Sequence, residues 1–336
     1  MTSSQAAFLP QERDWKHVVA ESFRDLGELL DFCEIDASRA GFNGKHDFAL
    51  RVTRYFASLI EKGNALDPLL LQVLPDAQEF RYVDGYTDDA VGDQQAMPVP
   101  GLIHKYHGRV LLTLTGACAI HCRYCFRRHF PYSGAGVDYD MNGQVMTYLS
   151  DNPEVNEVIL SGGDPLMVSD RKLAKLISQL NRIPHIRVLR IHSRVLSVLP
   201  ERVTGAFIET LRQFTGQIVF VTHINHPNEI STHNQTAFRL LAGHGYKIFN
   251  QSVLLKRVND SAKVLSELSN KLFESDIIPY YLHRLDKVQG AAHFDLSTGE
   301  SCRIYQQLRK QLPGYLLPVL VEEVAGQSSK TPVFCS

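Results

Sequence analysis

The chain has no long hydrophobic run, no block of like charge, no internal repeat and no low-complexity segment. Its apolar stretches fall short of the ~18 residues of a membrane-spanning helix, so we expect no membrane partner. Residues 1–10 lack a basic start followed by a long apolar core, so we expect no secretory signal. The formal net charge of −1 gives no electrostatic reason to expect nucleic acid as a partner.

Cysteine is also scarce, with six residues among 336. Cys33, Cys302 and Cys335 are scattered and form no metal-binding or disulfide pattern, and we interpret Cys33 and Cys302 as small buried hydrophobic residues in helices. Free thiols favour a reducing compartment, so we expect a cytoplasmic protein. The hydrophobic content of 44% is enough for one large domain with an appendage, or for two domains.

The other three cysteines, Cys118, Cys122 and Cys125, have the spacing C-x3-C-x2-C and follow the apolar run 110–114. Three thiolates on one loop can bind three irons of a [4Fe–4S] cluster and leave the fourth iron open to a small molecule. The alternatives are a structural zinc site or three incidental thiols. Structural zinc needs four ligands, and His121 could be the fourth only with strained geometry, because it adjoins Cys122.

Helical spacing of apolar residues predicts helices from residue 11 to about 63, the last of which Gly63-Asn64 would end. Residues 85–101 are polar and contain Pro98 and Pro100, so we interpret them as a linker. Further on, short β-branched runs alternate with amphipathic helical segments, which predicts an α/β fold with a parallel sheet and right-handed crossovers. Six such units predict a partial (β/α)6 barrel of the TIM type.

The predicted strands are 109–115, 157–161, 188–192, 218–223, 248–254 and 278–283, and helices between them are predicted at 169–182, 201–215, 233–244 and 262–275. We divide the chain into a helical N-terminal region with its linker (1–100), the partial barrel (101–310) and a C-terminal segment (311–336). The cysteine loop then lies at the carboxyl end of the first strand, where α/β barrels carry their catalytic residues.

Polar residues recur at the ends of the later strands. They are Gly162-Gly163-Asp164 after the second, His192-Ser193-Arg194 at the third, His223 at the fourth, Gln251 in the fifth and Asp286 after the sixth. Paired glycines let the backbone approach a ligand closely. Polar groups at equivalent strand ends indicate a lined cavity, although each histidine taken alone is usually structural.

Lys330 lies near the C-terminus, in a small-residue loop between an apolar strand and Pro332. Such a lysine suits a Schiff base, because burial helps its ammonium to lose a proton. Taken alone, it would more often be a solvated lysine on a tail.

Together these residues resemble the lysine 2,3-aminomutase family of radical S-adenosylmethionine enzymes. The similar stretches run from about residue 101 to 332 and include 118–130, 160–166, 223–229, 250–255 and 328–332. The resemblance implies a radical-enzyme barrel, three cofactors (a [4Fe–4S] cluster, S-adenosylmethionine and pyridoxal 5′-phosphate) and an external one-electron donor. It also implies the isomerisation of L-lysine to (R)-β-lysine.

The resemblance implies a role for each candidate residue. The cluster would be bound by Cys118, Cys122 and Cys125. Lys330 would be the catalytic lysine that forms the Schiff base with pyridoxal phosphate, and Arg109 would contribute to the phosphate site of that cofactor. The contacts of S-adenosylmethionine would be Gly162, Gly163, Asp164, His223 and Gln251. Arg127 would pair with the α-carboxylate of the substrate, and Asp286 with Glu323 would hold its distal ammonium. Arginine suits the carboxylate because its guanidinium can bind both oxygens.

Two features depart from the clostridial members of the family. Glu323 stands where those enzymes have an aspartate, and the sequence ends at Ser336 without their zinc-binding cysteines. The longer Glu323 side chain would crowd the ammonium pocket, which implies poor turnover of free lysine. Both features favour the bacterial branch whose (R)-β-lysine modifies elongation factor P, with that factor and its lysyl-ligase as partners and a homo-oligomeric state.

The alternatives are a free-standing lysine or glutamate 2,3-aminomutase and a non-catalytic iron–sulfur protein. Asp286 disfavours glutamate, because the distal group of glutamate is itself an anion.

Overall fold

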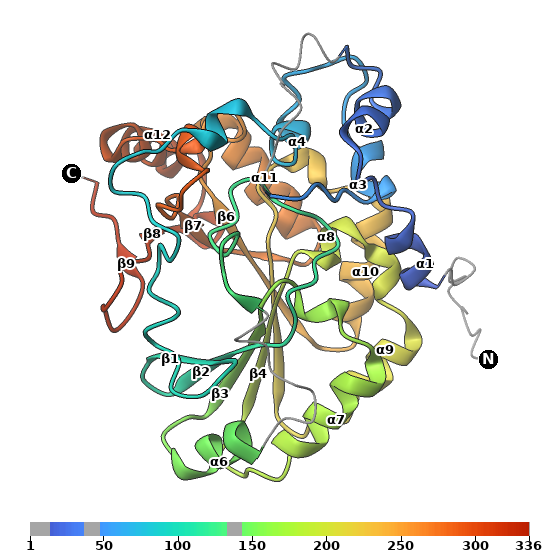
Figure 1. Cartoon of the computed structure of the whole chain (residues 1–336), viewed down its shortest axis with the longest axis vertical. Coiled ribbons are helices and arrows are strands. Elements are labelled where there is room, and N and C mark those ends of the chain that lie inside the picture. The colour runs from blue at the N-terminus through green and yellow to red at the C-terminus, as the bar shows by residue number, and fades with distance from the viewer. Residues whose placement is uncertain (1–13, 37–47, 133–142, 336) are drawn as a thin grey trace.

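The computed structural model describes residues 14–36, 48–132 and 143–335. Its centre is a nine-stranded sheet whose strands lie side by side in sequence order (Figure 1). The strands are β1 (Leu102–Tyr106), β2 (Arg109–Thr113), β3 (Glu157–Ser161), β4 (Val188–Ser193), β5 (Gln217–Thr222), β6 (Lys247–Val253), β7 (Ile278–His283), β8 (Val319–Glu322) and β9 (Thr331–Pro332). Strands β2 to β8 are parallel, and β1 and β9 are antiparallel edge strands.

A helix follows each of the first six parallel strands. The barrel helices are α6 (Gly143–Asp151), α7 (Asp170–Leu180), α8 (Val195–Val198), α9 (Gly205–Arg212), α10 (Thr232–Gly243), α11 (Ala262–Glu274) and α12 (Thr298–Gln311), and the 3-10 turns are η2 (Pro165–Met167), η3 (Pro200–Arg202), η4 (Pro227–Glu229), η5 (Ala292–Phe294) and η6 (Gly314–Leu316). The six predicted βα units are therefore present, and β8 adds a seventh parallel strand.

Side chains alternate along each strand, and this alternation explains why the two faces of the sheet differ in character. In β4, Leu189 and Ile191 are fully buried in the apolar core, whereas Arg190 and His192, which alternate with them, line a central cavity. Successive residues of a strand point to opposite faces, so one face packs under the helices while the other forms the cavity wall.

The N-terminal region contains shorter helices than the sequence pattern predicts. They are α1 (Trp15–Ala20), α2 (Leu26–Phe32), α3 (Arg54–Ser58), α4 (Pro68–Leu71) and the 3-10 turn η1 (Ala77–Phe80). Phe23 pairs with Val52 in an antiparallel bridge, so the expected helix through 48–53 is wrong. Residues 11–13 and 37–47 of the predicted helical stretch lie outside the described residues. Leu29, Phe56 and Leu69 belong to the same apolar core as the barrel strands.

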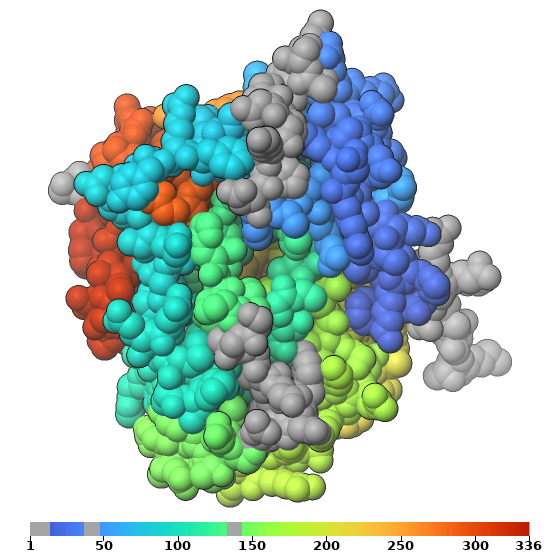
Figure 2. Space-filling view, in the orientation of Figure 1, coloured from blue at the N-terminus to red at the C-terminus, as the bar shows by residue number. Residues whose placement is uncertain are grey.

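The interpretation of 85–101 as a linker is also wrong. Thr87 bridges to Val288, Asp93 is 3% exposed, and Lys105 donates to the carbonyl of Val91 at 2.6 Å. The segment therefore packs on the barrel at these points although several of its polar residues are exposed, which composition alone does not reveal. In Figure 2 this cyan segment and the blue N-terminal residues flank the green region of the cysteine loop.

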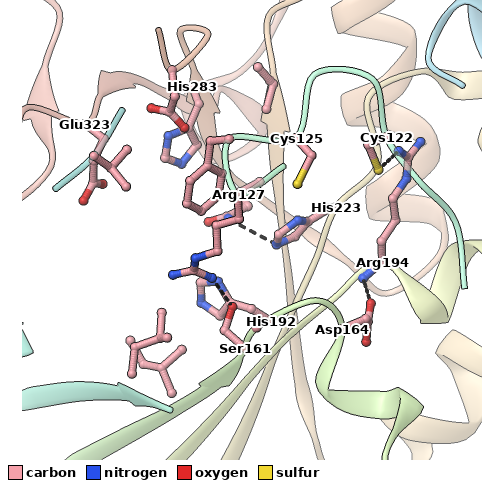
Figure 3. A pocket seen from close by; sticks show the side chains of 18 of the residues that line it. Cys122, Cys125, Arg127, Ser161, Asp164, His192, Arg194, His223, His283 and Glu323 are labelled. Atoms are coloured by element: carbon pink, nitrogen blue, oxygen red, sulfur yellow. Dashed lines mark hydrogen bonds between the residues drawn. The ribbon is translucent and has the colours of Figure 1, made fainter. Parts of the chain in front are cut away.

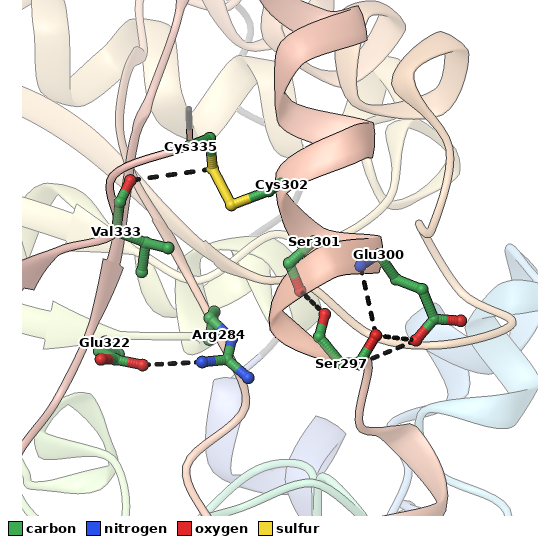
Figure 4. The surroundings of a disulfide bond; sticks show 8 residues. All are labelled: Arg284, Ser297, Glu300, Ser301, Cys302, Glu322, Val333 and Cys335. Carbon is green, nitrogen blue, oxygen red and sulfur yellow. Dashed lines mark hydrogen bonds and ion pairs between the residues drawn. A yellow bond between two sulfur atoms is a disulfide. The ribbon is translucent and has the colours of Figure 1, made fainter.

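Cys302 and Cys335 form a disulfide, with Cα atoms 5.1 Å apart (Figure 4). The sequence-based statement that they show no disulfide pattern is therefore wrong, although Cys302 does lie in a helix, α12. Their separation of 33 residues carries no signal, because the fold alone places the end of the chain against α12. Cys33 is a free, fully buried thiol, as predicted, but it lies directly after α2 rather than in a helix. Across the part of the chain that the structure describes, every helix is too short or too polar to cross a bilayer.

Candidate active site

One cavity of about 540 Å³ lies inside the sheet and towards the carboxyl ends of its strands (Figure 3). It is within the size range of small-molecule sites. All thirteen residues predicted from the sequence line it: Arg109, Cys118, Cys122, Cys125, Arg127, Gly162, Gly163, Asp164, His223, Gln251, Asp286, Glu323 and Lys330. The fold therefore brings together residues that are up to 221 positions apart in the sequence.

The cysteine loop is clamped by the N-terminal region. Arg51 donates from Nη1 to the carbonyl of Cys118 at 2.9 Å, and its own carbonyl accepts from the amide of His121 at 2.9 Å. Arg123, which is fully buried, forms an ion pair with Glu79. A buried guanidinium needs such a partner, so removing Glu79 would disturb the loop.

The glycine turn after β3 clamps the same loop from the other side. The amide of Gly163 donates to the carbonyl of Thr115 at 2.6 Å, and that of Asp164 donates to Ala117 at 2.9 Å. A Cβ atom on Gly163 would lie 2.6 Å from the carbonyl oxygen of Ala117. The close approach that the paired glycines permit is therefore an approach to the cysteine loop, in addition to any ligand.

His121 does not complete a metal site with the cysteines. Its Nδ1 lies 2.9 Å from the carbonyl of Ala49, and its ring stacks on Phe48 with centroids 5.3 Å apart. Among the described residues, no three His, Cys, Asp or Glu side chains converge as the ligands of a single ion would. Three cavity-lining thiols on one clamped loop instead fit three corners of an iron–sulfur cluster.

The cysteine thiols need a bound metal to ionise. Burial and the neighbouring Cys122 raise the pKa of Cys125 to about 11, and burial with the charge of Asp164 raises the pKa of Cys118 well above its usual range. A bound metal deprotonates a ligating thiol outright. Arg194 donates to Cys122 Sγ at 2.7 Å and to the hydroxyl of Tyr124 at 2.6 Å, a contact that its sequence position did not indicate.

Arg127 is 7% exposed, and only some of the donors of its guanidinium have a hydrogen-bond partner. Its Nε donates to Asp93 at 2.7 Å and its Nη1 to Ser161 at 2.9 Å, while Nη2 has no hydrogen bond within the described residues. Asp93 in turn forms an ion pair with Lys105 at 2.6 Å. This network fixes the guanidinium and leaves one edge for an incoming anion. Asp93 was missed because it lies in the supposed linker.

Lys330 follows the exposed turn between β8 and β9 and is only partly buried. Its Nζ lies 3.0 Å from Glu323 Oε2 and 5.7 Å from the centre of the Tyr281 ring. Tyr106 donates a hydrogen bond to the other oxygen of Glu323. A primary amine beside a carboxylate and an aromatic face fits a lysine that binds an aldehyde cofactor.

Asp286 differs from the other acids of the cavity because its carboxylate has no hydrogen bond or ion pair among the described residues. Burial raises its pKa to about 7, an effect that Glu323 reinforces and Lys330 opposes. An unpaired acid in a cavity gains most from a ligand that brings a positive charge.

The carboxylate of Asp164 is largely occupied within the protein. It accepts hydrogen bonds from the backbone amides of Leu166, Arg194 and Val195 and from the hydroxyl of Ser193, at 2.8–3.1 Å. Burial raises its pKa to about 6. Asp164 therefore ties the β3 and β4 loops together, and a contact with S-adenosylmethionine stays a prediction.

Besides His121, three histidines at strand ends line the cavity, and burial lowers the pKa of each. Gln251 and His223 are paired through their Nε2 atoms at 3.1 Å, and burial lowers the pKa of His223 to about 3. His192 and His283 each have a buried Nε2 without a partner in the described residues, and burial lowers the pKa of both. Sequence reasoning gave neither of them a role, although both lie at strand ends.

Arg109 lines the cavity deeper along β2, with its guanidinium 4.8 Å from the Tyr106 ring. Arg190 also lines it and forms an ion pair with Glu157 at 2.5 Å. Because Arg190 is held by Glu157, the predicted contact with a phosphate falls to Arg109.

Comparison with known proteins gives consistent results. A family model described as a 4Fe-4S single cluster domain matches residues 107–189, which contain the cysteine loop. An L-lysine 2,3-aminomutase of Escherichia coli (strain K12) is 47% identical over 96% of this chain and 95% of that protein. The L-lysine 2,3-aminomutase of Haemophilus influenzae is 43% identical over 97% of each. That of Clostridium subterminale is 36% identical over 95% of this chain and 77% of that protein.

Identity of this extent along nearly the whole chain, together with three thiols, a lysine and opposite charges in one cavity, shows that the chain belongs to the L-lysine 2,3-aminomutase family of radical S-adenosylmethionine enzymes with a [4Fe–4S] cluster.

Proposed function

We propose that this chain converts L-lysine to (R)-β-lysine by moving the α-amine to the neighbouring carbon. The observation that carries the proposal is that two opposite charges in the cavity can each accept a further partner. Arg127 has a free edge for a carboxylate and Asp286 has an unpaired carboxylate for an ammonium, and both line the cavity that contains the cysteines and Lys330. A substrate with an anion at one end and a cation at the other satisfies both.

Three cofactors would supply the chemistry that amino-acid side chains lack. When bound, the cluster and S-adenosylmethionine provide a carbon radical that can remove an unactivated hydrogen, and pyridoxal phosphate provides a conjugated ring that can carry the migrating nitrogen. Cys118, Cys122 and Cys125 would hold the cluster, Lys330 the pyridoxal aldehyde, and Arg109 its phosphate. Gly162, Gly163, Asp164, His223 and Gln251 are proposed contacts of S-adenosylmethionine.

The residues of the chain would position the substrate and reduce its contact with water. Arg127 and Asp286 would fix both ends of lysine, which sets the carbon that faces the radical. Burial lowers the pKa of His192, His223 and His283, so these three rings add no positive charge to the cavity wall. The distance between Arg127 and Asp286 would then select the length of the substrate. Asp286 would repel the anionic side chain of glutamate.

We further propose that the product serves the modification of elongation factor P through its lysyl-ligase, in the cytoplasm, and that the enzyme is a homo-oligomer that receives its electron from an external donor. In support, identity is 47% and 43% to the Escherichia coli and Haemophilus influenzae enzymes against 36% to the clostridial one, and Glu323 replaces the clostridial aspartate.

Chiral analysis of the product tests the proposed reaction. Reduced enzyme, S-adenosylmethionine, pyridoxal phosphate and L-lysine should yield (R)-β-lysine. Formation of β-glutamate from glutamate with lysine untouched would overturn the substrate and the role of Asp286. For the cellular role, ligase-dependent modification of elongation factor P by a β-lysyl group should require this enzyme when only α-lysine is supplied.

A further inference from the structure

Glu323 and Lys330 face each other because of the register of the last two strands. Glu322 in β8 pairs with Thr331 in β9, so the next residues outward, Glu323 and Lys330, are cross-strand neighbours at the base of the turn. Opposite charges in such positions attract, and the two side-chain ends lie 3.0 Å apart. The side chains of Glu323 and Lys330 are 13% and 23% exposed, so solvent screens the pair only partly.

Both oxygens of Glu323 are already engaged. Oε2 lies at Lys330, and Oε1 accepts from the hydroxyl of Tyr106 and lies 3.9 Å from Lys105 Nζ. Burial raises the pKa of Glu323, but the charge of Lys330 and the hydrogen bonds from Tyr106 and Lys330 outweigh it and hold that pKa below its usual range. The side chain is therefore a carboxylate directed at Lys330.

Asp286, by contrast, is left as the unpaired carboxylate of the cavity. An ammonium that entered between the two acids would meet one anion without a partner and one anion that already holds a cation. Displacing Lys330 from Glu323 would leave a partly buried ammonium uncompensated, which is costly.

We propose that Glu323 is the counter-ion of Lys330, in the free lysine and in the lysine bonded to the pyridoxal aldehyde, and that it is not a ligand of the distal ammonium of the substrate. This inference rests on the proposed attachment of pyridoxal phosphate to Lys330. Tyr106 acts as a positioning residue that aims the carboxylate, and Asp286 alone reads the substrate ammonium. Besides Lys330, the other charged groups that act on Glu323 or Asp286 are Lys105 and Asp93, and each stays in place in the variants below.

The protonation of the Schiff-base nitrogen tests this inference directly. The nitrogen of the bonded lysine is positively charged when protonated, so a nearby carboxylate raises its pKa. The absorbance of pyridoxal-phosphate-loaded enzyme would be titrated against pH for the wild type, Glu323→Gln, Glu323→Asp and Glu322→Gln. Lysine affinity would be measured on the same samples, without S-adenosylmethionine, from the spectral change on adding lysine.

In Glu323→Gln the absorbance transition should move down by at least about one pH unit, because one unit corresponds to 1.36 kcal/mol and the lost ion pair is partly buried. Glu323→Asp keeps the charge and should shift less. Glu322→Gln is the matched control, since Glu322 pairs with Arg284 at 2.8 Å and should leave the transition unchanged. Lysine affinity should change by less than about threefold in Glu323→Gln, well below the loss of an ionic substrate contact.

An unshifted transition in Glu323→Gln, with lysine affinity reduced about tenfold or more, would overturn the inference and make Glu323 a substrate ligand. Loss of covalent cofactor from Glu323→Gln, but not from Glu323→Asp or Glu322→Gln, would support it, because charge rather than shape separates these variants. Peptide mass spectrometry after borohydride reduction distinguishes a failure of the proposed cofactor site from a failure of the proposed role of Glu323. An adduct on another lysine refutes the proposed cofactor site, whereas an adduct on Lys330 with an unshifted transition refutes only the role of Glu323.

Discussion

The two loops that meet at the cavity are held in opposite ways. The cysteine loop is clamped by residues from distant parts of the chain: Arg51 and Glu79 from the N-terminal region, Gly163 after β3 and Arg194 after β4. The turn that precedes Lys330 is exposed from Val324 to Ser329, and its ends are held by the short β8–β9 pair and the disulfide. Local stability follows the number of buried contacts, so the first loop is preformed and the second is the more easily perturbed.

This contrast suits the groups that each loop would bind. Three ligands of one cluster must keep fixed relative positions, and a clamped loop provides that. A lysine that binds and releases an aldehyde needs freedom to move, and a turn with few contacts allows it. The predictions that follow test whether the two loops are independent.

The largest effect is expected from the cysteines themselves. Replacing Cys118, Cys122 or Cys125 by alanine removes one of three ligands, and iron content and 5′-deoxyadenosine formation should fall to background. Iron analysis and product chromatography measure both. Cys335→Ser is the control and should keep full iron. A single-cysteine variant that retains iron and cleaves S-adenosylmethionine would contradict the cluster assignment.

Lys330→Ala should abolish aminomutase activity and covalent pyridoxal phosphate while iron stays at the wild-type level. Iron should stay bound because the cysteine loop is held by the N-terminal region and by the loops after β3 and β4, and not by Lys330. Borohydride reduction followed by mass spectrometry detects the adduct, and the exposed Lys287→Ala is the control. A loss of iron in Lys330→Ala would show that the two loops are coupled.

Asp286→Ala and Asp286→Asn should each lower lysine turnover by about 10²–10³-fold, because an unpaired buried ammonium costs several kcal/mol and each 1.36 kcal/mol is a factor of ten. The pKa of Asp286 is raised to about 7, so its binding-competent carboxylate is lost as the pH falls through that value. Lysine affinity of the wild type should therefore decrease below about pH 7. A pH-independent affinity from pH 6 to 8 would exclude Asp286 as the ammonium ligand.

Two glycine variants compare the loops directly. Gly163→Ala would place a Cβ atom 2.6 Å from the carbonyl oxygen of Ala117, so the cysteine loop must shift and iron occupancy should fall markedly. Gly326→Ala has open space around it and suffers only from its φ of +81°, so it should cost about 1–2 kcal/mol of stability. Iron analysis and thermal unfolding report the two effects. Equal iron loss in both would reject the contrast between the loops.

The smallest effect on activity is expected from Cys335→Ser. Opening the disulfide frees the end of the chain beyond Lys330, and the free energy of unfolding should fall by about 2–4 kcal/mol, as is typical for one disulfide. Iron content should not change, and pyridoxal phosphate should dissociate faster. Unfolding in denaturant and the rate of cofactor loss measure these outcomes. An unchanged rate of cofactor loss would mean that the β8–β9 pair alone holds Lys330.

Much of this protein follows from its sequence. The six predicted strands correspond to β2–β7 within two residues at each end, because short β-branched runs alternate in the sequence with helix-length amphipathic segments. The cysteine spacing predicted a cluster because the three cysteines lie close together in the chain, whereas the role of Lys330 was predicted only from the resemblance to the family.

The tertiary structure alone decided the rest. Asp93 in the supposed linker, Arg194 at Cys122 and Glu323 at Lys330 acquire their roles from contacts that the fold creates between residues with no mutual signal in the sequence. The same holds for Cys302 and Cys335, and for the short N-terminal helices, whose lengths are set by packing on the barrel. Local pattern determines which elements form and which chemical groups they carry, whereas the ion pair that each group makes depends on distances across the fold.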